Sequence, residues 1–237
     1  MWDFFFNFAA DLEIEMCMKE HLVILLLLIP LAIQAQWRFG VNGGAAWNHY
    51  SMDKQYATDY RFEGRWGGTA GITAQYNFFD WLGLRAGAFF AQRNYRHTRG
   101  AYADRLDIRY VNNYLLFPVT VNFSFGGQQV RGFVNLGVYG GAWLTSNRSG
   151  QEYSSISSTG YEASEKVAFS DRRDQRGDFG YTGGLGIEYK FHPHWMAQIE
   201  AVCYYSVISA TKQYMEHQKD YRYHTTIGLQ AGISYIF

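Results

Sequence analysis

Five charged residues lie on the polar face of segments that are otherwise apolar or small, and each falls within a few residues of a short turn. They are Arg85, Arg131, Glu188, Lys190 and Glu200. Opposite charges removed from water are stable when they pair, and loss of one partner leaves the other buried and unpaired at a large energetic cost. We therefore expect a structural network of ion pairs. The alternative is a gate or a narrow ion path.

Two histidine motifs are further candidate sites. His49-Tyr50-Ser51 places an imidazole two residues from a hydroxyl, a pair that could activate the serine as a nucleophile for lipid hydrolysis if an acid oriented the histidine. No such acid is identifiable from the sequence. His192-Pro193-His194 could supply two metal ligands, but no third ligand accompanies them, so a turn is the better interpretation. We expect no catalytic residues, no metal site and no cofactor.

Eight segments that alternate between apolar and polar residues position these side chains. In the last one, Leu229 and Ile227 alternate with Gln230 and Thr226. A period of two is the signature of β-strands, because successive side chains point to opposite faces. The segments cover residues 38–47, 67–78, 82–95, 108–125, 130–144, 178–191, 195–207 and 222–237.

The connections between these segments differ in length. Short turns are expected near 77–80, 126–129 and 192–194, and long polar loops at 48–66, 96–107, 145–177 and 208–221. Short turns on one side and long loops on the other are typical of outer-membrane barrels. The sequence predicts an all-β fold, an eight-stranded antiparallel up-and-down transmembrane β-barrel. A soluble sandwich or lipocalin-like barrel is the alternative, but the face opposite the charges carries almost none, which favours a polar interior and a lipid-facing exterior.

The first 35 residues differ from the rest. An apolar run from Leu22 to Ile29 is too short to span a bilayer as a helix and fits a signal peptide, with Met18 as the initiator, cleavage after Ala35 and a mature start at Gln36. Residues 36–237 then form one barrel domain. The chain has 21 basic and 21 acidic residues, and removing 1–35 leaves 20 against 16. This balance gives no support for a nucleic-acid partner, and the single mature cysteine excludes an intramolecular disulfide.

Three short motifs carry a family resemblance. They are Tyr114-Leu115-Leu116-Phe117-Pro118, Asp178-Phe179-Gly180 followed by Gly184-Leu185-Gly186, and the terminal Tyr235-Ile236-Phe237. From Gln36 to Phe237 the chain resembles the PorT-like outer-membrane β-barrel family, although Phe117 stands where an acidic or aliphatic residue is commoner. The resemblance implies the outer membrane of a Gram-negative cell, contact with lipid and lipopolysaccharide, and recognition of the C-terminal strand by the barrel insertion machinery.

These motifs are architectural, so they indicate compartment and fold rather than ligand. We expect a structural or interaction role through the extracellular loops, with the charged loop 145–177 as the first candidate for contact with a protein partner. The alternatives are a narrow channel for ions or small solutes and a lipid A-modifying hydrolase. The sequence favours a protein that is not an enzyme.

Overall fold

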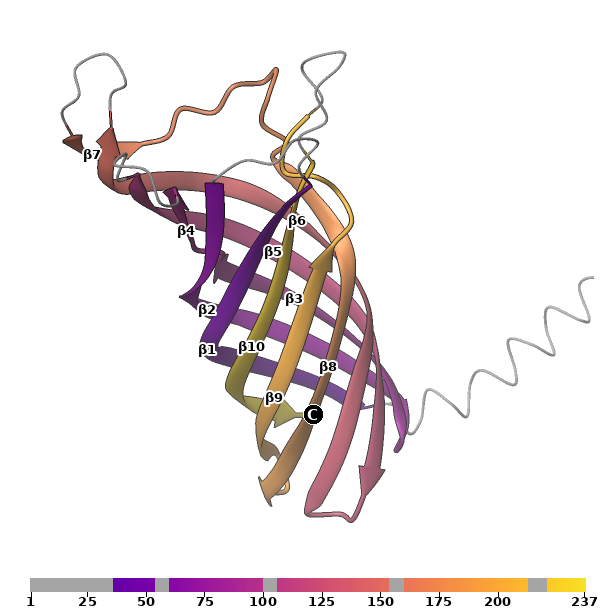
Figure 1. Ribbon diagram of the computed structural model, residues 1–237. Helices are drawn as coiled ribbons and strands as arrows, with labels where there is room; N and C mark the ends of the chain where they lie inside the picture. The colour runs from indigo at the N-terminus through magenta and orange to yellow at the C-terminus, as the bar shows by residue number, and fades with distance from the viewer. Residues whose placement is uncertain (1–35, 54–59, 100–105, 154–159, 213–220) are drawn as a thin grey trace, which may run out of the picture.

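The computed structural model describes residues 36–53, 60–99, 106–153, 160–212 and 221–237, which form one antiparallel sheet closed into a barrel (Figure 1). These described residues contain ten strands. They are β1 (Gln36–Asp53), β2 (Tyr60–Phe79), β3 (Leu82–Gln92), β4 (Tyr95–Arg99), β5 (Asp107–Gly126), β6 (Val130–Tyr153), β7 (Gly160–Lys166), β8 (Gly177–His192), β9 (Trp195–Ser206) and β10 (Tyr221–Ile236).

The ring has eight strand positions, as the sequence predicts. Strands β3 and β4 together occupy one position, because both pair with β2 on one side and with β5 on the other. Only Arg93 and Asn94 separate them. Strand β7 pairs with the end of β6 and stands outside the ring. The ring closes where β1 pairs with β10, from Arg38 opposite Ile236 to Asp53 opposite Tyr221. Within the described residues, no helix is long and apolar enough to cross a membrane.

The loop boundaries predicted from the sequence are wrong at three long connections. Strands β1 and β2 run through most of 48–66, β4 covers 96–99 of the predicted loop 96–107, and β6 and β7 occupy 145–153 and 160–166. The reason is physical: above the membrane a strand still satisfies its backbone by pairing, but it no longer needs an apolar face. Alternation therefore stops where the lipid ends, while the strand continues.

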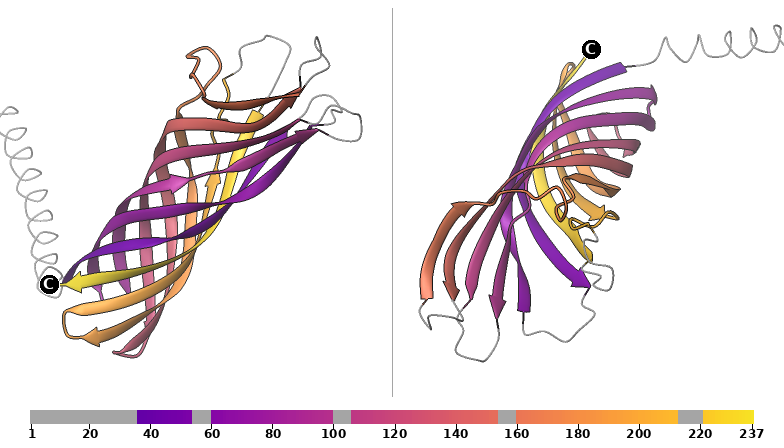
Figure 2. Two further views of the ribbon diagram at one scale, coloured as in Figure 1. Left: turned by 90° about the vertical axis from the view of Figure 1, so that its left-hand side faces the viewer. Right: turned by 90° about the horizontal axis from the view of Figure 1, so that it is seen from above.

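The strands on this side separate into two groups. Pairing of β1 with β2 ends at Asn48 and Arg65, whereas β1 continues alongside β10. The upper parts of β2, β4, β5 and β6 remain paired with one another and with β7, and we call this five-stranded extension the extracellular leaf (60–64, 95–99, 107–112, 147–153 and 160–166). Figure 2 shows the leaf fanning away from the rest of the barrel.

Side-chain exposure confirms that the polar face is inside. On β8, Leu185 and Ile187 are 66% and 61% exposed, whereas Glu188 is 3% exposed. Aromatic side chains mark both borders of the apolar band. Trp81, Phe125 and Trp195 are exposed at the short-turn end, and Trp47 packs edge-on against Trp66, with ring centroids 5.6 Å apart, near the leaf. This is the girdle expected at the two membrane–water interfaces.

Glycines on the inward face make room for large neighbours in a narrow interior. A Cβ atom at Gly186 would lie 2.5 Å from the ring of Phe133, and one at Gly184 would lie 2.5 Å from a carboxylate oxygen of Glu200. An eight-stranded barrel is just wide enough for side chains to fill it. The glycines therefore bring the charged and aromatic side chains into contact across the lumen.

Cysteine labelling tests the orientation of β8. In a Cys203→Ser background, a single cysteine at Leu185 or Ile187 should react with or be quenched by lipid-soluble probes, because these positions face the bilayer. A cysteine at Glu188 should be shielded from the same probes. The reverse pattern, with position 188 in lipid and position 185 shielded, would contradict the polar-inside orientation.

Candidate functional site

The lumen contains two of the predicted charges as a buried ion pair. Arg85 on β3 and Glu200 on β9 approach to 3.0 Å, and both side chains are buried. The other oxygen of Glu200 accepts a hydrogen bond from Asn135 on β6 at 2.7 Å, and Gln230 on β10 donates to the first oxygen at 3.3 Å. Four strands from opposite sides of the ring are thereby linked through one carboxylate.

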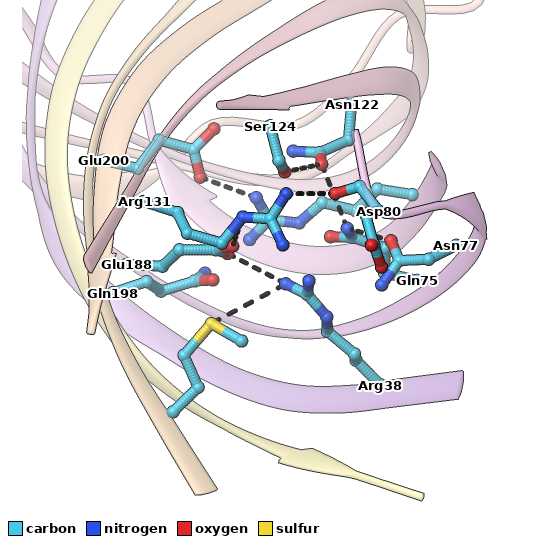
Figure 3. Close-up of polar contacts among 12 residues, drawn as sticks. Arg38, Gln75, Asn77, Asp80, Asn122, Ser124, Arg131, Glu188, Gln198 and Glu200 are labelled. Carbon is cyan, nitrogen blue, oxygen red and sulfur yellow. Dashed lines mark hydrogen bonds and ion pairs between the residues drawn. The ribbon is translucent and has the colours of Figure 1, made fainter. Parts of the chain in front are cut away.

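A second cluster lies nearer the periplasmic end (Figure 3). Glu188 on β8 pairs with Arg38 on β1 at 2.8 Å, and the Nε of Arg131 on β6 lies 4.0 Å from its other oxygen. Arg131 also donates to the backbone carbonyl of Asp80 in the turn between β2 and β3. Arg38 is a member that sequence reasoning missed, although its position between the outward-facing Trp37 and Phe39 indicates an inward side chain.

Lys190 differs from the other four predicted residues. It is half-buried at the periplasmic mouth and forms no ion pair within the described part of the chain. The mouth itself is a cavity of about 550 Å³ whose lining includes Lys190, Arg131 and Glu188. The structure thus brings Arg131 near Glu188 and Arg85 onto Glu200, and it leaves Lys190 at the edge of the cluster.

Neutral polar side chains form further hydrogen bonds in this half of the lumen. Asn122 donates to Asn135 at 2.8 Å and accepts from Gln75 at 3.1 Å and from Ser124 at 2.8 Å. On the opposite side, Gln198 donates to Asn42 at 2.6 Å. Hydrogen bonds among buried polar side chains hold them in one arrangement, because a polar group that loses its partner in a low dielectric is costly. The periplasmic half of the lumen is therefore a cross-linked plug.

A cationic side chain crosses the middle of the lumen. Arg93, at the break between β3 and β4, has no exposed surface and forms an ion pair with Asp178 on β8. Its guanidinium carbon lies 5.0 Å from the ring centre of Tyr114 and 5.3 Å from that of Tyr139, within the range of cation–π attraction. The hydroxyl of Tyr139 is 2.8 Å from that of Ser206 on β9.

An aromatic layer separates Arg93 from the plug. The buried rings and aliphatic groups of this layer are Phe89, Leu116, Tyr139, Val202 and Tyr204. The void between this layer and the Arg85–Glu200 pair is about 20 Å³, roughly the space of one water molecule. Side chains thus fill the lumen between the plug and Arg93.

The extracellular mouth, by contrast, opens into a cavity that we call the vestibule. Tyr50 on β1, Tyr95 on β4 and Tyr110 on β5 stack in sequence at its base, with ring centroids 4.2 and 4.7 Å apart. The vestibule has a volume of about 400 Å³. Its charged lining residues are Arg148, Glu165, Lys166, Arg173, Asp174 and Arg222. Five of them, all except Arg222, lie within the predicted interaction loop 145–177, part of which forms strand in the structure.

The two histidine motifs do not form a larger site within the described residues. His49 and Ser51 lie exposed on β1 above the membrane band, and no carboxylate in the described residues hydrogen-bonds to His49. His192 and His194 flank the turn between β8 and β9, with ring centroids 6.1 Å apart, and Nδ1 of His194 is 3.0 Å from the carbonyl oxygen of Ile236. The described residues contain no group of three or more potential metal ligands.

Double-mutant analysis tests the Arg85–Glu200 pair. Arg85→Met should lower the free energy of unfolding by about 3–5 kcal/mol, because Glu200 would remain buried without its cation. The double variant Arg85→Met with Glu200→Met should recover a large part of this loss. The measurement is reversible urea unfolding in detergent or lipid vesicles.

Lys190→Met is the matched control, because it removes a cation that has no ion pair in the described structure. Its effect should stay within about 0.5 kcal/mol, as for ordinary surface substitutions. Equal destabilisation by Arg85→Met and Lys190→Met would contradict the role given to the buried pair.

Comparison with known proteins agrees with this architecture. The family model described as outer membrane protein beta-barrel domain matches residues 22–237. The crystal structure of OprG from Pseudomonas aeruginosa superposes with a TM-score of 0.51 at 14% identity, covering 84% of this chain and 95% of that chain. Escherichia coli outer membrane protein W gives 0.40 at 16% identity (84% and 97% covered), and Neisserial surface protein A gives 0.39 at 14% (83% and 96%). No curated protein matches in sequence.

Proposed function

Since the chain belongs to the outer membrane protein β-barrel domain family and is a protein of the outer membrane, we propose that it acts there as a closed barrel. Its role is structural or one of interaction, exerted through the extracellular leaf and vestibule, and it involves no catalysis. The lipid-facing exterior contacts outer-membrane lipid and lipopolysaccharide.

The filled lumen is the observation that supports this proposal. Between the two mouths, Arg85 and Glu200 are held by hydrogen bonds from both sides of the ring, and Phe89 and Tyr204 lie above them with a void of about 20 Å³. A permanent path for a solute larger than water would have to displace these side chains. The vestibule, in contrast, is accessible from one side and carries diverse polar groups.

Three finer features belong to the same proposal. The chain is a PorT-like member of the family, consistent with its Tyr114–Pro118 and terminal Tyr235–Phe237 motifs. Residues 1–35 are a signal peptide, with Met18 as the initiator and residues 36–237 as the mature barrel. The insertion machinery recognises the C-terminal strand, and a protein partner docks on the extracellular side.

A narrow channel is the second candidate, and the two mouth cavities favour it. Cavities of about 400 and 550 Å³ approach the plug from opposite ends. Conduction would require the aromatic layer to open and Arg85 to leave Glu200, which makes these side chains the gate in the channel hypothesis. The third candidate is a lipid A-modifying hydrolase that uses His49 and Ser51. Loss of lipid A modification in the Ser51→Ala variant would support it.

Planar-bilayer recording distinguishes the closed barrel from the channel. The purified wild-type protein should show no discrete openings. A variant that combines Arg85→Ala with Phe89→Ala should leak, because it empties both the plug and the aromatic layer. Leu185→Ala, on the lipid-facing side, should behave as the wild type. Regular single-channel openings of the wild-type protein would reject the closed barrel in favour of the channel.

Analysis of the mature protein tests the compartment and the signal peptide together. The outer-membrane fraction should contain a chain whose N-terminal residue is Gln36, as read by mass spectrometry of the intact protein and its N-terminal peptide. Recovery of a chain that retains residues 1–35 from the soluble cytosolic fraction would contradict the processing and the export route.

A further inference from the structure

The base of the vestibule places two arginines beside the stacked tyrosines. Tyr50 lies beside Arg222, and Tyr110 lies beside Arg148. A guanidinium has donors only, so each tyrosine oxygen accepts from its arginine. Burial raises the pKa of Tyr110, opposed in part by Arg148, so the hydroxyl keeps its proton at neutral pH.

The acceptors in the vestibule are already engaged. Glu165 accepts from two nitrogens of Arg148, one of them at 2.7 Å. Asp174 accepts from the backbone N–H of Ser170 at 2.8 Å and from Nε of Arg173 at 2.9 Å. These ion pairs engage Arg148 and Arg173 together with the two carboxylates, so the excess positive charge of the lining comes from Lys166 and Arg222.

The lining of the vestibule carries an excess of positive charge. Four basic side chains (Arg148, Lys166, Arg173 and Arg222) face two acidic ones (Glu165 and Asp174). Lys166 is exposed at the end of β7, where its ammonium group forms no ion pair with a described residue. Arginine and lysine are the side chains that recognise carboxylates and phosphates through charge-assisted hydrogen bonds.

The size of the vestibule sets the size of its ligand. Its volume of about 400 Å³ lies within the roughly 300–1,000 Å³ typical of small-molecule sites. The half-buried indole of Trp143 adds an apolar surface to one wall. The wall is rigid there, because Trp143 stacks on Tyr114 with the two rings 3° from parallel.

We propose that the vestibule binds an oxyanion-bearing small molecule of the size of a sugar phosphate. This inference rests on the proposed interaction role of the extracellular side and names its ligand class. The ligand is either a free solute or a phosphorylated sugar at the end of an outer-leaflet glycolipid, and the two sources present the same group to Lys166 and Arg222.

Calorimetric titration of the detergent-solubilised full-length mature protein with glucose 6-phosphate tests the proposal, with glucose as the uncharged control. Glucose 6-phosphate should bind, and glucose should bind at least about tenfold more weakly, since a hydrogen bond to a charged group contributes more than a neutral one. Binding should weaken as salt concentration rises. Equal binding of both sugars, or no binding of either, would overturn the proposal.

Substitutions locate the site. Lys166→Gln and Arg222→Gln should each weaken glucose 6-phosphate binding about tenfold. Arg109→Gln is the matched control, because it removes the same charge from an exposed β5 position outside the vestibule lining. Equal weakening by Arg109→Gln would indicate a diffuse electrostatic effect and overturn the site. Unchanged heat-modifiable gel migration confirms that each variant is folded. If Arg222→Gln does not fold, Lys166→Gln still tests the site, because Lys166 is exposed.

Two further arms separate the sources and the hypotheses. In nanodiscs, lipid A should lower the apparent affinity for glucose 6-phosphate if lipid-borne phosphate occupies the vestibule, and should leave it unchanged if the ligand is a free solute. Channel openings in the bilayer recording would reject the closed barrel but leave this binding result standing. Loss of glucose 6-phosphate binding would reject the ligand class while leaving the closed barrel standing.

Discussion

The absence of hydrogen-bonding partners in lipid is the constraint on which the rest of this structure depends. Each backbone N–H and C=O within the bilayer must bond inside the protein, and a sheet achieves this only when its first strand meets its last. The pairing of β1 with β10 provides this closure. Closing after eight strand positions makes a narrow ring, and a narrow ring in turn forces its inward side chains into contact. The filled lumen therefore follows from the closure itself.

Within this narrow interior, geometry selects how charge is accommodated. Removing Arg85 or Glu200 from water is unfavourable unless each has the other and the remaining oxygens and nitrogens have partners. The amides of Asn135 and Gln230 complete the shell around Glu200. Arg93 is accommodated differently, by Asp178 and by the faces of two aromatic rings. The lumen is thus layered into a polar plug, an aromatic layer, the central cation Arg93 and an open mouth.

Much of this architecture could be predicted from period-two alternation. Whether a residue such as Leu185 or Glu188 faces the lipid or the lumen follows from its odd or even place in the strand. The pairing of charges could not, since which arginine meets which glutamate depends on the stagger of strands around the ring, and Arg38 and Glu188 are far apart in the chain. Strand β7 was missed for another reason. Its Glu162, Ser164 and Lys166 stand above the lipid, where a strand carries no apolar face to reveal it.

The seam between β1 and β10 also has a consequence for the order of folding. Its first paired residues, Arg38 and Ile236, are about 200 positions apart, whereas most other strand pairs join neighbours along the chain. Non-local contacts carry the largest loop-closure entropy and form late. Before the seam forms, the folding intermediate exposes two strand edges, each with a row of unpaired backbone groups that would template aggregation. The closed ring leaves the mature barrel no free strand edge within the membrane. For the same reason, assembly requires a surface that shields the edges of β1 and β10 until the two strands pair.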